Sequence, residues 1–270
     1  MSFKRGLAGL GLGAALTIAA CGSAQAAAID VVAYTTGGVT VIDFEDVAST
    51  VYPGVTYDGL LTSRGAVFGE RFQGQTLSTV TDIYTGAPLD VLSGAPVGPL
   101  SLVAGAAGQN LAVGQDGLTA NLVPCGAYGC SNPNGYGEGA FAVLFSGPIS
   151  YFGFQQLFGS GPGLTTVDFF DTSGGLIQRV TVNTVGAYAF ARAGGVKDIA
   201  GVSVFTTDPG GLSYDNLVYD APAAASGGGA TGGVPEPSAW ALMILGFGGA
   251  GAMLRRRPRG PGLAAMRTAG

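Results

Sequence analysis

The sequence predicts an all-β protein, and three observations carry this prediction. Short segments rich in Val, Phe, Tyr and Thr recur about every ten residues between positions 28 and 221. Glycine and proline, with 49 and 14 of the 270 residues, separate these segments as turn residues do. No segment of this region has the period of an amphipathic helix. We therefore expect a single domain over residues 28–221, an antiparallel β-sandwich of the jelly-roll type.

The expected strands mostly alternate apolar and polar residues, as strands do when one face of a sheet is buried. Two of them flank a Ser-Gly-Gly turn and predict a hairpin, with Val167 and Phe169 facing Ile177, Val180 or their neighbours. The expected strands are 39–45, 65–72, 100–105, 109–114, 141–146, 150–157, 165–172, 176–183, 188–193, 200–207 and 212–220.

Residues 1–26 have the layout of a secretory signal peptide. Lys4 and Arg5 precede an apolar stretch, and an Ala-Gln-Ala sequence ends at Ala26, after which we expect cleavage. The alternative is a lipoprotein signal in which Cys21 carries the lipid.

The C-terminal part predicts a linker and a short membrane span. Residues 222–234 hold almost no large side chains, which is typical of a flexible linker. Residues 238–254 carry no charge and reach the lower limit of a segment that crosses a bilayer. We expect residues 258–270 to be a cytoplasmic tail. The positive residues that flank the span on that side are Arg255, Arg256 and Arg257.

A compact motif precedes and enters this span. A Pro-Glu-Pro tripeptide is followed two residues later by a Trp-Ala pair, then by a glycine-bearing apolar stretch and the arginine cluster. In this order the segment 235–257 resembles the PEP-CTERM sorting signal of exported Gram-negative bacterial proteins, in its PEPxxWA form. The motif residues are Pro235, Glu236, Pro237, Trp240 and Ala241.

The resemblance implies an exosortase as partner, an integral membrane transpeptidase that cuts near the PEP motif. The tripeptide would be the recognition element, the span a transient anchor in the inner membrane, and the arginines a stop-transfer signal. Prolines keep the backbone extended, so that a peptidase can bind an open strand. We therefore expect an exported protein that reaches the cell surface or the extracellular space; the alternative is a plain single-pass anchor.

The body of the chain is strongly acidic. Between residues 27 and 234 there are 16 acidic and 5 basic residues, a net charge of −11. Nucleic acid is excluded as a partner, because its phosphates require a basic surface. The charge is compatible with a secreted protein or with bound divalent cations.

Cys125 and Cys130 are the cysteines that remain after signal cleavage. In an exported protein this pair predicts a local disulfide that stiffens a loop. Zinc is the alternative, although a chain without histidine offers it few ligands.

The absence of histidine also excludes catalytic centres built on Ser-His-Asp or Cys-His. Carboxylate pairs remain, and in principle they could make a glycosidase site. We interpret them as solvated surface acids and expect no enzyme. The acids considered are Asp43, Glu45, Asp46, Asp168 and Asp171.

Calcium is a further possibility for the acids near the two ends of the body, because it binds carboxylate and carbonyl oxygens. The segments IDFE and YDN also resemble the first and last strands of many PEP-CTERM bodies and of some carbohydrate-binding sandwiches. The candidate calcium ligands are Asp43, Glu45, Asp215 and Asn216.

Two functions are favoured, and a secreted glycoside-active enzyme that uses carboxylates alone is a third alternative. The first is a non-enzymatic structural or adhesive role at the cell surface, linked to exopolysaccharide or biofilm. The second is a carbohydrate-binding module that stacks sugars on exposed aromatic side chains. The aromatic candidates are Tyr128, Tyr136, Tyr151 and Phe152, of which the phenylalanine is expected in the core.

Overall fold

The structure is a computed structural model that describes residues 28–220, apart from 83–85, 118 and 160–162. These residues belong to one compact unit, Met1–Ala223. Several predicted features lie outside the described residues. They are the signal peptide, Cys21, the linker, the sorting motif, the span with its arginines and the cytoplasmic tail. In the described part, no helix is long and apolar enough to cross a membrane.

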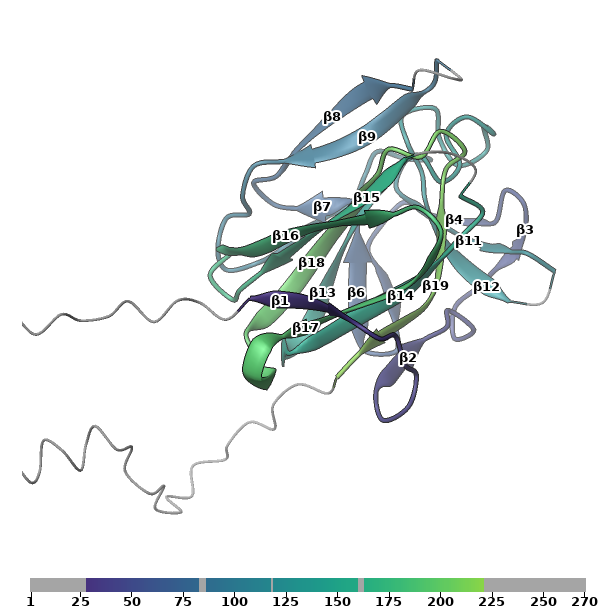
Figure 1. Ribbon diagram of the computed structural model, residues 1–270. Helices are drawn as coiled ribbons and strands as arrows, with labels where there is room; N and C mark the ends of the chain where they lie inside the picture. Colours follow the sequence, from purple (N-terminus) through teal and green to yellow (C-terminus); the bar gives the residue numbers. More distant parts are fainter. Residues whose placement is uncertain (1–27, 83–85, 118, 160–162, 221–270) are drawn as a thin grey trace, which may run out of the picture. The chain divides into compact units, whose positions relative to one another are not determined.

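The larger of two main sheets has nine strands, and it is antiparallel except where β3 pairs in parallel with β11 (Figure 1). Its order is β1-β17-β14-β19-β12-β11-β3, with β2 paired to β19 and β4 paired to β11. The strands are β1 (Ile29–Val32), β2 (Thr40–Ile42), β3 (Thr50–Val51), β4 (Val55–Tyr57), β11 (Leu111–Gln115), β12 (Ala120–Pro124), β14 (Tyr151–Leu157), β17 (Gly186–Arg192) and β19 (Ser213–Tyr219).

The second main sheet has six antiparallel strands in the order β16-β15-β18-β13-β6-β5. Two small sheets, β7-β10 and β8-β9, accompany it, and the β8-β9 hairpin lies at the top of Figure 1. These strands are β5 (Leu61–Ser63), β6 (Ala66–Gly69), β7 (Arg71–Phe72), β8 (Thr76–Thr81), β9 (Pro88–Ser93), β10 (Leu102–Val103), β13 (Ala140–Ile149), β15 (Leu164–Phe170), β16 (Leu176–Asn183) and β18 (Ile199–Thr206). A 3-10 turn, η1 (Ala193–Gly195), precedes β18.

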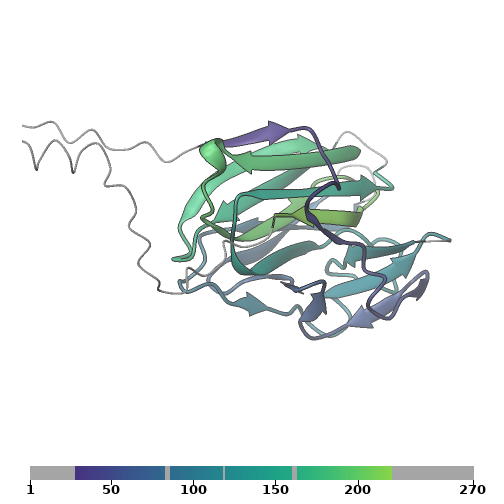
Figure 2. The ribbon, with the colours of Figure 1, turned by 90° about the horizontal axis from the view of Figure 1, so that it is seen from below.

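The two main sheets face each other across one apolar core, so the fold is a β-sandwich, seen from a second direction in Figure 2. Aromatic side chains from both sheets meet there: the rings of Phe141 and Tyr214 are 4.9 Å apart, and Phe169 lies 5.3 Å from Phe190. Full burial of one such side chain stabilises a fold by about 1.5–3 kcal/mol. The core therefore rests on the inward residues of every long strand.

The outer face of the six-stranded sheet is covered as well. All eight residues of β18 are buried, where alternation would leave half of them exposed. Phe72 of β7 packs against Phe170, and Leu92 of β9 clusters with Phe205. The two small sheets thus explain why the β18 sequence is almost continuously apolar.

The predicted hairpin is present as β15 and β16. Val167 lies directly opposite Val180, whereas Phe169 lies opposite Gln178. In the turn, the Asp171 carboxylate accepts hydrogen bonds from the backbone N–H groups of Ser173 and Gly175. This is the way Asp side chains stabilise tight turns.

The all-β prediction is confirmed, but several strands differ from the expected segments. The segment expected at 39–45 forms a strand only over β2, because the chain leaves the sheet after Ile42 and Phe44 has a left-handed φ of 56°. The strands β1, β3, β4, β5, β8, β9 and β12 were not expected. Nine and six strands exceed the eight of a simple jelly roll, so the jelly-roll order stays a prediction.

Candidate functional site

A pocket of about 250 Å³ opens on the nine-stranded sheet, on the face turned away from the core. Leu122 of β12 and Tyr214 of β19 pair with each other and point into the core. Because side chains alternate along a strand, Asn121 and Ser213 point to the opposite face. Six side chains that define the pocket are the aromatic Tyr52, Tyr136 and Phe158 and the polar Asp116, Asn121 and Ser213.

Glycines let the backbone segments of this site approach one another closely. A Cβ added to Gly114 of β11 would collide with the hydroxyl of Tyr136, which lies directly above it. A Cβ on Gly211, where φ is +69°, would meet the carbonyl oxygen of Tyr136. The pocket therefore depends on bare backbone at these two positions.

The aromatic side chains lie on three separate segments. The rings of Tyr52 and Tyr136 meet edge to face, with centroids 5.0 Å apart. Phe158 follows β14, and its side chain lines the pocket although the residue is 65% exposed. Its φ of 67° is in the left-handed region, which is rare for a bulky residue. Such strained residues cluster at functional sites.

Two buried polar atoms of the pocket residues have no hydrogen-bond partner among the described residues. They are Oδ1 of Asn121 and Oγ of Ser213, on side chains that are only 2% and 3% exposed. Native proteins rarely leave buried polar groups unsatisfied, because each costs about 1–3 kcal/mol. A water molecule or a ligand can supply the missing partners. The side-chain oxygen of Asn121 can only accept a hydrogen bond.

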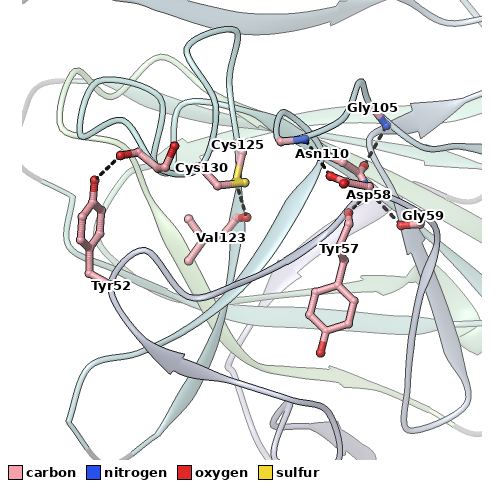
Figure 3. The surroundings of a disulfide bond; sticks show 11 residues. Tyr52, Tyr57, Asp58, Gly59, Gly105, Asn110, Val123, Cys125 and Cys130 are labelled. Atoms are coloured by element: carbon pink, nitrogen blue, oxygen red, sulfur yellow. Dashed lines mark hydrogen bonds between the residues drawn. A yellow bond between two sulfur atoms is a disulfide. The ribbon is translucent and has the colours of Figure 1, made fainter.

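A disulfide packs next to two of the residues that line the pocket, Val123 and Tyr136 (Figure 3). Cys125 and Cys130 are joined, with Cα atoms 4.9 Å apart. They pack with Val123 and Tyr136 on the outer face of the sheet. Tyr52 donates a hydrogen bond from its hydroxyl to the carbonyl oxygen of Ser131, in the loop that follows the disulfide (3.1 Å). The predicted cysteine pair thus forms a disulfide rather than a zinc site. The disulfide stiffens the loop that carries Tyr136.

Asn110 holds the segment after β4 in place (Figure 3). Its side-chain amide donates to the carbonyl oxygens of Tyr57 and Gly59, at 2.6 and 2.9 Å, and its Oδ1 accepts from the N–H of Gly105. These bonds fix the chain that leads back through β4 to Tyr52.

Ionisation at the site is shifted towards neutral forms. Burial raises the pKa of Tyr136, and the neighbouring Tyr52 adds a smaller contribution to this shift. The phenol therefore stays protonated at neutral pH. Burial also raises the pKa of Asp215, two residues beyond Ser213, to about 6. The negative charges of Asp116, Asp43 and Glu45 contribute to this shift.

The predicted calcium ligands come from segments that the fold brings together. β2 pairs with β19 so that Ile42 lies opposite Leu217, which places Asp43, directly after β2, next to Asn216 in the middle of β19. Each already has a protein partner, however. Asp43 pairs with Arg64 at 3.1 Å, and the Asp215 carboxylate accepts from the backbone and side chain of Asn216.

Glu45, the fourth candidate, accepts a hydrogen bond from the N–H of Ala120 at 2.9 Å. It lies in the turn after β2 and not in a strand, although the segment 39–45 was expected to be one. The described residues contain no group of three or more acidic or cysteine side chains arranged to hold a metal ion. Calcium stays a prediction.

The acids considered for catalysis serve the fold. Asp168 forms two hydrogen bonds with Arg179, at 2.6 and 2.7 Å, and Asp171 caps the β15-β16 turn. Asp46 accepts from the hydroxyl of Ser63 and the N–H of Arg64. The interpretation as solvated surface acids is wrong for Asp168, which is 1% exposed, whereas Glu45 and Asp46 are exposed.

Of the four aromatic residues considered as a sugar platform, Tyr136 alone lines the pocket. Phe152 is fully buried in the core, and Tyr151 accepts a hydrogen bond from the N–H of Thr35. Sequence reasoning missed Tyr52, Phe158, Asn121 and Ser213. They come from distant segments, and none lies in a recognisable motif.

Fold and site together define an all-β protein with two facing sheets and a pocket of about 250 Å³ on an outer face. Its C-terminal region gives a more specific assignment. Residues 233–257 match the family model of the PEP-CTERM protein-sorting motif. The motif indicates an exported protein and implies an exosortase as its processing partner. No curated protein sequence matches the chain.

Proposed function

We propose that this exported protein is released from the inner membrane by an exosortase and then serves a non-enzymatic, adhesive role on extracellular polysaccharide. In this proposal the sorting motif directs delivery, and the pocket binds carbohydrate at the cell surface or in a biofilm matrix. The proposed role does not require bound calcium.

One observation carries the binding part of the proposal: the residues that line the pocket include three aromatic side chains and two side chains whose buried polar atoms lack protein partners. A sugar ring offers both complements. Its carbon-bound hydrogens suit the faces of aromatic rings, and its hydroxyl groups can donate to Asn121 and exchange a hydrogen bond with Ser213.

The size of the pocket limits the ligand. At about 250 Å³ it lies just below the range of about 300–1,000 Å³ that holds a drug-sized molecule. It therefore suits one sugar unit of a longer chain, with the neighbouring units in solvent. Such a site binds a polysaccharide at many positions, and this repetition favours adhesion through multivalency.

A non-enzymatic role is supported by the absence of histidine and by the structural contacts of the candidate acids. Among the described residues that line the pocket, Asp116 is the single carboxylate. A glycosidase requires two carboxyl groups on either side of the bond that it cleaves.

Binding is tested by calorimetric titration of the mature secreted protein with glucose, galactose and mannose tetrasaccharides. We expect at least one of them to bind, and Asn121→Leu to weaken that binding tenfold or more. Asn134→Leu, in an exposed turn, is the control and leaves the affinity unchanged. Absence of binding to all three series, or equal affinity in Asn121→Leu, would reject carbohydrate binding.

Delivery is tested by intact-mass spectrometry of the protein from cells with and without the exosortase. We expect a chain that begins at Ala27 and ends near Pro237 when the enzyme is present, and an intact tail when it is absent. An intact tail in both cells would leave a plain membrane anchor. The same spectra detect a lipid on Cys21.

A further inference from the structure

We infer that the pocket selects uncharged sugar units and rejects uronic acids and other anionic sugars. This inference rests on the proposed function and narrows its ligand. The observation behind it is the position of the lysine and arginine side chains in residues 28–220, here called the body.

Every basic side chain of the body is already paired with an acid. Between residues 28 and 220 the sequence has five lysines and arginines, and each of the five forms an ion pair. None of them lines the pocket. The pairs are Arg64–Asp43, Arg71–Glu70, Arg179–Asp168, Arg192–Asp198 and Lys197–Asp220.

The surroundings of the pocket are instead acidic. Asp116 lies on its rim, and Asp215 stands two residues beyond Ser213 on the same strand. These two acids lie close enough to interact electrostatically. A carboxylate or sulfate on the ligand would meet like charge here, and no free cation of the body would compensate for it.

The polar atoms within the pocket also favour a hydroxyl group. Oδ1 of Asn121 can only accept a hydrogen bond, so an ionised carboxylate in contact with it would bring two acceptors together. A hydroxyl donates to Asn121 and can accept from Ser213. A site that buries such atoms discriminates against ligands that leave them unpaired.

Matched ligands test this inference. Oligosaccharides of glucuronate, galacturonate and mannuronate are titrated into the mature protein both as free acids and as methyl esters, which differ by the charge at the same ring position. In about 10 mM salt, we expect the ester of the recognised sugar to bind at least tenfold more tightly than the acid. The difference should shrink in about 1 M salt, where the Debye length falls to about 3 Å.

Two variants assign the selectivity to the pocket. Asp116→Asn should reduce the ratio between ester and acid, whereas Asp30→Asn on the edge strand β1, an exposed acid outside the pocket lining, should leave it unchanged. An acid that binds as tightly as its ester, with both lost in Asn121→Leu, would overturn the charge selectivity and keep the carbohydrate site. Absence of binding by every neutral and charged sugar would overturn the proposed function itself.

Discussion

The hydroxyl of Tyr136 lies directly above the bare backbone of Gly114, in the space that a side-chain carbon at residue 114 would need. This contact joins the loop after the disulfide to strand β11. It places the phenol at the wall of the pocket, next to Tyr52.

Gly114→Ala should therefore displace Tyr136 and damage the pocket. The backbone at residue 114 does not have a positive φ, so alanine fits the strand itself and the cost comes from the collision. We expect sugar affinity to fall at least tenfold, about 1.4 kcal/mol, by calorimetry. Gly59→Ala is the control, since a Cβ there meets no atom within 4 Å. Unchanged affinity in Gly114→Ala would show that the Tyr136 position is not needed.

Asn110 should be one of the more important polar residues for stability. Asn110→Ala removes three hydrogen bonds and leaves the backbone groups of Tyr57, Gly59 and Gly105 without these partners. We expect the free energy of unfolding to fall by about 2–4 kcal/mol in urea denaturation. Asn134→Ala, which removes an exposed side chain, should cost less than about 0.5 kcal/mol. Similar losses in the two variants would contradict the assigned role.

The disulfide should matter more for binding than for folding. It closes a short ring, so the double variant Cys125→Ser with Cys130→Ser should lose on the order of 2 kcal/mol of stability. Sugar affinity should fall as well, because Cys125 bridges to Tyr136. Thermal melting and calorimetry measure the two effects. A double variant that melts at a lower temperature but binds sugar as tightly as the wild type would show that the disulfide loop is not needed for binding.

Because of Glu138, we expect the folding stability of the protein to fall as the pH rises. Its side chain is buried, its Oε2 has no partner among the described residues, and burial raises its pKa from 4.5 to about 8, with further contributions from the acids Asp82, Asp208 and Asp90. Below pH 4.5 both the folded and the unfolded chain keep the proton. Between pH 4.5 and about 8 the unfolded chain releases it first, so folding stability declines.

Glu138→Gln should remove this part of the pH dependence. At pH 8 we expect the variant to be more stable than the wild type by roughly 1–3 kcal/mol, and at pH 4 to differ little. The exposed Glu45→Gln serves as a control with the same chemical change. Parallel stability curves for wild type and Glu138→Gln would contradict the raised pKa.

The fold was predictable where strands are long and alternate clearly. The β15-β16 hairpin combines a Ser-Gly-Gly turn with β-branched and aromatic residues, and its strands match the expected segments closely. The β8-β9 hairpin was missed because β8 has only two large apolar side chains, Leu77 and Val80, and β9 begins with Pro88. Such segments become strands through tertiary packing, here of Leu92 against Phe205.

The site was less predictable, because it is assembled by pairing of distant strands. Asn121 and Ser213 come onto one face, in diagonal positions across β12 and β19, through the register pair Leu122–Tyr214. The residues next to Phe158 in the sequence do not indicate its left-handed backbone conformation. The sorting motif is different: its meaning lies in a contiguous segment, and the family model matches it at residues 233–257.

The most direct test is a crystal structure of the mature protein with the neutral oligosaccharide that binds most tightly. We expect one sugar ring against Tyr52, Tyr136 and Phe158, with one hydroxyl group within hydrogen-bond distance of Asn121 Oδ1 and another oxygen at Ser213 Oγ. A sugar bound on another face, with this pocket holding only water, would contradict it.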